Sequence, residues 1–147
     1  MAELKPAPEE LLVAVDFSPC SLRALDTALT WRSATAELTV LHVLDRDFIA
    51  RIDEVGLGNA DATLKRLRER AEDELARLVA ERRVERVETM IVVGTPFLEI
   101  VKIANDLECD LIVIGIHGHD SGLRQLLFGG TAEKVLRGAK RPVLCVP

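Results

Sequence analysis

The stretch DLIVIGIHGHDSGLRQLLFGGTAEKVL, from Asp110 to Leu136, decides the fold of this chain. It opens with an acidic residue and four large apolar side chains, the pattern of a strand that is covered on both faces in a parallel sheet. Glycines follow at 115, 118, 129 and 130 around a partly apolar insert, and a helix is predicted to begin at Gly130 or Thr131. The role of a glycine-rich connection directly after a buried strand is therefore the question that the sequence raises.

Outward from this stretch, apolar runs and amphipathic segments alternate along the chain. Strands are predicted at residues 11–16, 37–43, 87–93, 110–115 and 142–146, and helices from 19 to about 31, 61 to about 84, 95 to about 107, and 130 or 131 to 139. Residues 1–8 are predicted as a flexible N-terminus and 46–60 as a mobile loop that could cover a site. The alternation predicts one α/β domain over 1–147, an open five-stranded parallel sheet with helices on both faces.

Composition and charge exclude several classes of function. The 147 residues carry a formal net charge of −5 and only 3% aromatic residues, which disfavours binding to nucleic acid and to an anionic membrane. No apolar run approaches the roughly 18 to 20 residues of a membrane span. The acidic opening lacks a secretory pattern, and three widely separated cysteines indicate reduced thiols. We therefore expect a cytoplasmic protein.

In open parallel sheets, ligands bind outside the carboxyl ends of the strands, where the strand order reverses. If the first and fourth strands are neighbours there, Asp16 and the loop after Gly115 meet at one crevice. Glycine backbone can approach a ligand closely, and the N–H groups of a helix N-terminus favour anions such as phosphate. A plain turn before a helix remains the alternative explanation of the same glycines.

Longer segments of the chain resemble the universal stress protein family. The resemblance is carried by Leu-Val-Ala-Val-Asp-Phe-Ser near the start, Leu-Thr-Val-Leu-His-Val-Leu-Asp and Val-Val-Gly-Thr-Pro in the middle, and Leu-Leu-Phe-Gly-Gly-Thr-Ala-Glu-Lys-Val-Leu and Arg-Pro-Val-Leu-Cys-Val near the end. It covers roughly residues 9 to 147. The resemblance implies an adenine nucleotide alpha hydrolase-like fold with strand order 3-2-1-4-5, a homodimer, and, in one branch of the family, an ATP site marked by Gly-x2-Gly-x9-Gly-Ser/Thr.

Carried over residue by residue, the resemblance implies an adenine-nucleotide site. Asp16 would accept hydrogen bonds from the ribose or the base edge, and Ala14, Val15 and Val43 would form the apolar wall of the adenine slot. The ribose and α-phosphate side would be lined by Ile114, Gly115, His117 and Gly118, and Gly129, Gly130 and Thr131 would offer backbone N–H groups and one hydroxyl to the phosphates. Each also has a plainer explanation: the apolar residues would be core in any fold of this class, and Asp16 would cap the helix behind it.

The sequence departs from the motif in two places. Ten residues separate Gly118 from Gly129 where the motif has nine, and Gly130 stands where the motif has a hydroxyl residue, so that the hydroxyl comes at Thr131. The backbone cradle needs no side chains, but the loop must bulge by one residue. These departures favour the alternative of a dimeric stress scaffold that does not bind nucleotide.

Catalytic groups are not recognisable in the sequence. Ser18, Ser121 and Cys20 have no histidine in a recognisable nucleophile arrangement, and no Gly-x4-Gly-Lys-Ser/Thr motif assigns a lysine or a magnesium hydroxyl. His117 and His119 lack further metal ligands, and His42 is expected to be a hydrogen-bonded buried histidine. We therefore assign no catalytic residue and no metal ligand, and expect at most slow ATP hydrolysis.

The resulting hypothesis is a regulatory or signalling module of the stress response that binds ATP, with or without Mg²⁺. AMP or another adenine nucleotide is the alternative ligand. A homodimer is expected through the last strand, Pro142 to Val146, because this apolar segment ends the sequence and would lie at a sheet edge.

Overall fold

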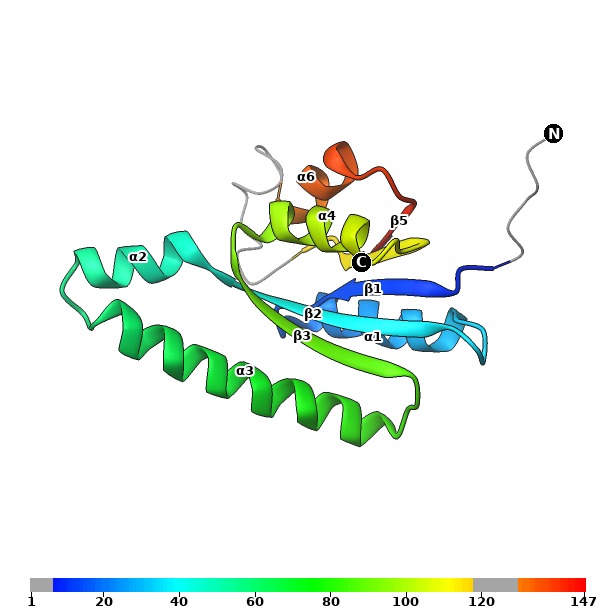
Figure 1. Ribbon diagram of the computed structural model, residues 1–147, viewed down its shortest axis with the longest axis horizontal. Helices are drawn as coiled ribbons and strands as arrows, with labels where there is room; N and C mark the ends of the chain where they lie inside the picture. The colour runs from blue at the N-terminus through cyan, green and yellow to red at the C-terminus, as the bar shows by residue number, and fades with distance from the viewer. Residues whose placement is uncertain (1–6, 118–129) are drawn as a thin grey trace.

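The computed structural model describes residues 7–117 and 130–147, which form one five-stranded parallel sheet with helices on both faces (Figure 1). The strands are β1 (Glu10–Ala14), β2 (Glu37–Asp45), β3 (Val87–Gly94), β4 (Leu111–Gly115) and β5 (Val143–Val146), and the helices are α1 (Pro19–Trp31), α2 (Arg46–Glu54), α3 (Ala60–Arg82), α4 (Pro96–Asp106) and α6 (Thr131–Gly138). The order across the sheet is β3-β2-β1-β4-β5. The strand order implied by the family resemblance is thereby confirmed.

Each strand divides its side chains between two cores because successive residues point to opposite faces of a sheet. On β1, Leu11 and Val13 join a core with α1 and α3, while Leu12 and Ala14 join a second core with α4 and α6. All four side chains are buried. The continuous apolar runs of the sequence follow directly from this two-sided coverage.

Local signals set the helix boundaries. Ser18 caps α1, its hydroxyl accepting a hydrogen bond from Ser21 N at 3.3 Å, and Pro19 occupies the first turn. Asn59 caps α3 by accepting from Asp61 N at 2.8 Å. Helix α3 ends at Arg83, a left-handed residue with φ of 48°. The start of α1 agrees with the sequence prediction.

Residues 46–54 form helix α2, which corrects the prediction of a mobile loop over 46–60. Asp45 caps this helix, its carboxylate accepting from Asp47 N at 2.9 Å and Phe48 N at 3.4 Å. The side chain of Ile49 is buried and anchors it. The turn at 55–59, which contains Gly56 with a φ of 70°, then leads into α3.

None of the helices within 7–117 and 130–147 combines the length and the apolar character needed to cross a lipid bilayer.

Candidate functional site

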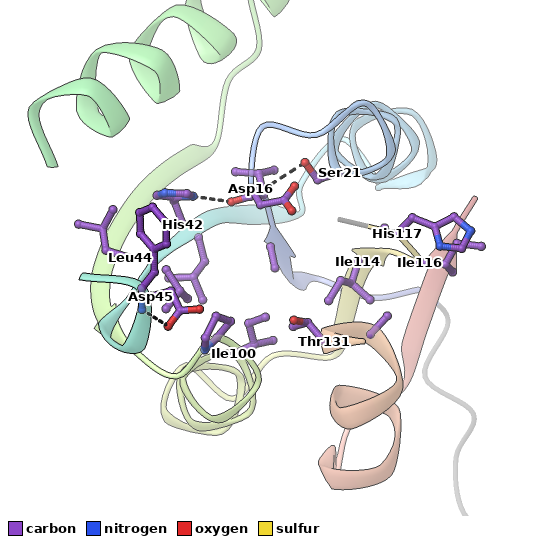
Figure 2. Close-up of a pocket in the computed structure, with 18 of the residues that line it drawn as sticks. Asp16, Ser21, His42, Leu44, Asp45, Ile100, Ile114, Ile116, His117 and Thr131 are labelled. Carbon is purple, nitrogen blue, oxygen red and sulfur yellow. Dashed lines mark hydrogen bonds between the residues drawn. The ribbon is translucent and has the colours of Figure 1, made fainter. Parts of the chain in front are cut away.

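A cavity of about 550 Å³ opens at the carboxyl ends of the strands, where the strand order reverses between β1 and β4 (Figure 2). Most of its exposed surface is apolar. Its lining comes from β1, β2 and β4 and from the helices that follow or flank them: Ala14, Val15, Asp16, Ser21, Leu41, His42, Val43, Leu44, Asp45, Phe48, Arg51, Leu67, Pro96, Ile100, Ile114, Gly115, Ile116, His117, Thr131 and Ala132. The topology therefore places a cavity where the parallel-sheet rule expects a ligand.

Asp16 stands at the exit of β1, at the mouth of this cavity and beside the first turn of α1. Its Oδ1 accepts hydrogen bonds from Ser18 N at 3.0 Å and from the Ser18 hydroxyl, and its backbone N donates to Ser21 Oγ at 3.3 Å. The carboxylate thus supports the helix cap, in agreement with the plainer explanation of this residue. The half-buried residue also lines the cavity.

Gly115 allows α1 to approach the end of β4. A Cβ atom on this residue would lie 2.8 Å from the Cys20 carbonyl carbon and 2.9 Å from Ser21 N, closer than real Cβ contacts. Its requirement for glycine therefore comes from packing between helix and strand, and the same close contact forms part of the cavity wall.

His42 lies on β2 and its ring is fixed from two sides. Its Nδ1 lies 2.7 Å from the carbonyl oxygen of Val15, which can only accept, so Nδ1 carries the proton. The Phe17 ring lies 4.6 Å away between centroids, and Phe17 itself adopts a φ of 64°, unusual for a bulky residue. The hydrogen bond expected from the sequence is present, but the residue is half-buried rather than buried, because its imidazole lines the cavity.

Helix α6 begins beside the cavity without a side-chain cap. Gly130 is its N-cap, has no side chain to accept from the first-turn N–H groups, and is followed by the cavity-lining Thr131. Such amide groups and the helix dipole favour an anion. The Lys134 ammonium lies 5.4 Å from the centroid of the Phe97 ring of α4.

The end of β5 is tied to the beginning of the glycine-rich loop through one thiol. The Cys20 Sγ donates to the Val146 carbonyl at 3.0 Å and accepts from His117 N at 3.5 Å. The same carbonyl accepts from Ile116 N at 2.9 Å. Cys20 therefore joins α1, the exit of β4 and the last strand.

Eight of the residues predicted from the sequence lie around this one cavity: Ala14, Val15, Asp16, Val43, Ile114, Gly115, His117 and Thr131. Gly130 directly precedes Thr131, and Gly118 and Gly129 lie outside the described residues. Their common location is a structural finding, whereas their role in binding a nucleotide stays a prediction. Among the described residues, no group of three or more His, Cys, Asp and Glu side chains could hold a metal ion.

No residue in the wall built by α2, α3 and α4 was assigned to the site from the sequence, which predicted only that a loop at 46–60 could cover a site. Asp45, Phe48 and Arg51 come from the segment around α2, and Leu67 and Ile100 come from α3 and α4. The capping carboxylate followed by Phe48 and Ile49 was the signal that could have revealed α2. The contributions of Leu67 and Ile100 depend on tertiary packing, which no local pattern records.

Fold and cavity together define the class: a parallel α/β protein of strand order 3-2-1-4-5 with a cavity at the reversal of strand order. The chain belongs to the universal stress protein family, whose model matches residues 9–147. It is 32% identical to universal stress protein MJ0577 of Methanocaldococcus jannaschii, with 94% of each chain covered, and 30% identical to universal stress protein YxiE of Bacillus subtilis, with 93% of this chain and 97% of the relative covered.

Solved structures agree with this assignment. The structure of MJ0577 superimposes with a TM-score of 0.80 over 94% of each chain. A universal stress protein in complex with cAMP is 29% identical and gives a TM-score of 0.64, with 96% of this chain and 98% of that chain covered. That relative binds an adenine nucleotide.

Proposed function

We propose that this chain binds an adenine nucleotide, with ATP as the first candidate, in the cavity at the carboxyl ends of the strands. The observation that carries the proposal is that one end of the cavity suits an anion and the other end is apolar. One end is the uncapped N-terminus of α6 at Gly130, and the other is an apolar wall that includes Leu41 and Val43. A nucleotide has the same polarity, with anionic phosphates at one end and a flat, largely apolar base at the other.

The orientation of the nucleotide follows from this polarity. The phosphates lie against the backbone of Gly130 and Thr131, where N–H groups and the helix dipole favour negative charge. The base lies toward the end of β2, and Asp16, between the two ends, accepts hydrogen bonds from the ribose or the base edge. Because β1 lies between β2 and β4, a nucleotide in this orientation spans the point at which the strand order reverses.

The relative in complex with cAMP supports an adenine nucleotide as the ligand class. ATP with Mg²⁺, AMP and cAMP share the adenosine portion and differ in phosphate charge, so affinities for the three rank the alternatives. With no catalytic residue assigned, the biochemical role is regulatory: occupancy of the cavity changes the surface that the protein shows to its partners in a stress response. Any ATP hydrolysis is expected to be slow.

Titration calorimetry tests this proposal after bound nucleotide has been extracted and identified by chromatography. ATP is expected to bind the wild-type protein, and Asp16→Ala is expected to raise the Kd about tenfold or more, because a charged hydrogen-bond acceptor is lost. Asp73→Ala is the matched control, because it removes an exposed carboxylate on α3 that does not line the cavity. Thermal unfolding of each variant verifies that the fold is intact.

The alternative function is a dimeric scaffold without nucleotide. The extra residue between Gly118 and Gly129 and the glycine at position 130 favour it. A folded dimer that is free of co-purified nucleotide and binds neither ATP, AMP nor cAMP would overturn the nucleotide proposal and establish the scaffold as the leading hypothesis.

A further inference from the structure

Helix α2 places a half-exposed aromatic ring in the wall of the cavity. Phe48 is 51% exposed, although its neighbour Ile49 is buried and holds the helix against the body of the protein. Aromatic residues are scarce in this chain, which has four Phe, one Trp and no Tyr. Single exposed apolar side chains are common on protein surfaces, and Trp31 is 70% exposed. Phe48 differs from Trp31 in that its ring also lines the cavity.

The sheet order shows which part of the cavity this ring faces. Asp45, the last residue of β2, caps α2 and binds Phe48 N, so that Phe48 lies in the first turn after β2. Strand β1 separates β2 from β4, which leads toward α6, so two strand spacings of roughly 5 Å each lie between the two exits. In Figure 2, Asp45 and Thr131 accordingly lie on different sides of the cavity.

The surroundings of Phe48 suit a flat aromatic ligand. Leu44 and Leu67 line the same cavity, and so does Arg51, one turn further along α2, whose Nε donates to Asp47 O at 3.4 Å. Among the described lining residues, Arg51 is the only Lys or Arg. Apolar side chains and a guanidinium both pack favourably on the face of a base. This side of the cavity thus has the chemistry of a base-binding wall.

We propose that Phe48 is the residue against which the nucleobase packs, and that α2 thereby sets the affinity of the cavity for the base portion of its ligand. This inference rests on the proposed nucleotide function and adds to it a specific side chain outside the glycine-rich motif. An aromatic ring packs on any base, because every base has a π-face. Phe48 therefore strengthens binding of ATP and of GTP by the same factor, without choosing between them.

The experiment compares Phe48→Ala and Phe48→Trp with Val55→Ala by titration calorimetry. The control at Val55 also removes an exposed apolar side chain from the end of α2, but this side chain does not line the cavity. ATP, GTP and inorganic tripolyphosphate serve as probes of the base and phosphate contributions. Far-UV circular dichroism verifies that each variant keeps the helix content of the wild type.

Phe48→Ala is expected to raise the Kd for ATP and for GTP about tenfold each, and to leave tripolyphosphate binding unchanged. Phe48→Trp is expected to keep or improve the affinity for both nucleotides, and Val55→Ala to change none of the three. A Kd for ATP within twofold of wild type in Phe48→Ala would overturn the role of Phe48 and leave the proposed function standing. Absence of ATP, AMP and cAMP binding in the wild-type protein would overturn the proposed function itself, and with it the role of Phe48.

Discussion

Gly115 shows how one missing side chain organises this site. The residue ends β4, and the backbone of Cys20 and Ser21 occupies the space in which its Cβ would lie. The contact holds the N-terminus of α1 against the exit of β4, where the cavity begins. A residue first interpreted as a ligand contact is thus also a packing requirement of the fold.

Gly115→Ala is expected to lower the free energy of unfolding by about 1 to 3 kcal/mol, because the new methyl group meets backbone atoms that cannot rotate away. Urea denaturation followed by circular dichroism measures the change. Gly138→Ala is the control, because its Cβ would meet only Val101 Cγ2 at 3.8 Å and it stands at the end of α6. Equal unfolding free energies in the two variants would contradict the packing argument.

Helix α2 follows β2 directly and forms one wall of the cavity. Asp45 begins this short helix, Ile49 anchors it and Phe48 faces the cavity. A helix of nine residues is marginal by itself, so its stability depends on this cap and on its packing.

Asp45→Ala is expected to weaken α2 by about 1 kcal/mol, because the acceptor for Asp47 N and Phe48 N is lost. Asp45→Asn keeps an acceptor of similar capping strength and is expected to behave as wild type. Hydrogen exchange measures the difference, with protection of the α2 amides falling roughly fivefold in the alanine variant alone. Equal losses in both variants would assign the stabilisation to the carboxylate charge and contradict the cap.

The same helix marks the limit of what the sequence predicts. The central strands β1 and β4 were predictable because their apolar runs are covered on both faces, and the start of α1 because Ser18 and Pro19 form a local signal. Residues 46–60 were misinterpreted because Gly56 and Gly58 lie close to a helix of only nine residues and obscure its weak periodicity.

The sequence likewise predicts only part of the candidate site. Asp16 and the loop after Gly115 were placed together because the carboxyl ends of parallel strands meet at one edge of the sheet, whereas Val43 and Thr131 were implied by the resemblance to the universal stress protein family. Phe48 and Leu67 were missed because their positions depend on how α2 and α3 fold back over that edge.

For the whole molecule, the two edges of the sheet differ in their capacity to pair. Strand β3 carries exposed Glu88 and Thr89, polar side chains that discourage further pairing, whereas β5 consists of Val143-Leu-Cys-Val. Pro142 O and Val146 O accept hydrogen bonds from β4 and the residue after it, so the backbone groups of Val143 and Cys145 point away from β4. A homodimer through β5 is therefore our proposal for the assembly.

Val143→Lys is expected to convert a dimer into a monomer at micromolar concentration, because it places a charge on the edge strand that forms the proposed interface. Sedimentation velocity measures the change. Thr89→Lys makes the same addition of charge on the opposite edge, β3, and is expected to leave the dimer intact. A monomeric wild-type protein, or a dimer that survives Val143→Lys, would contradict the proposed interface.

The hydrogen bonds of the Cys20 thiol connect the cavity wall to the edge strand β5. They join the carbonyl of Val146, at the end of the edge strand, to the amide of His117, in the cavity wall. A ligand that shifts the backbone of His117 therefore also acts on the strand through which two copies would pair. Linkage is reciprocal, so if assembly alters the ligand affinity of each protomer by a given factor, saturation of both sites alters the dimer dissociation constant by the square of that factor.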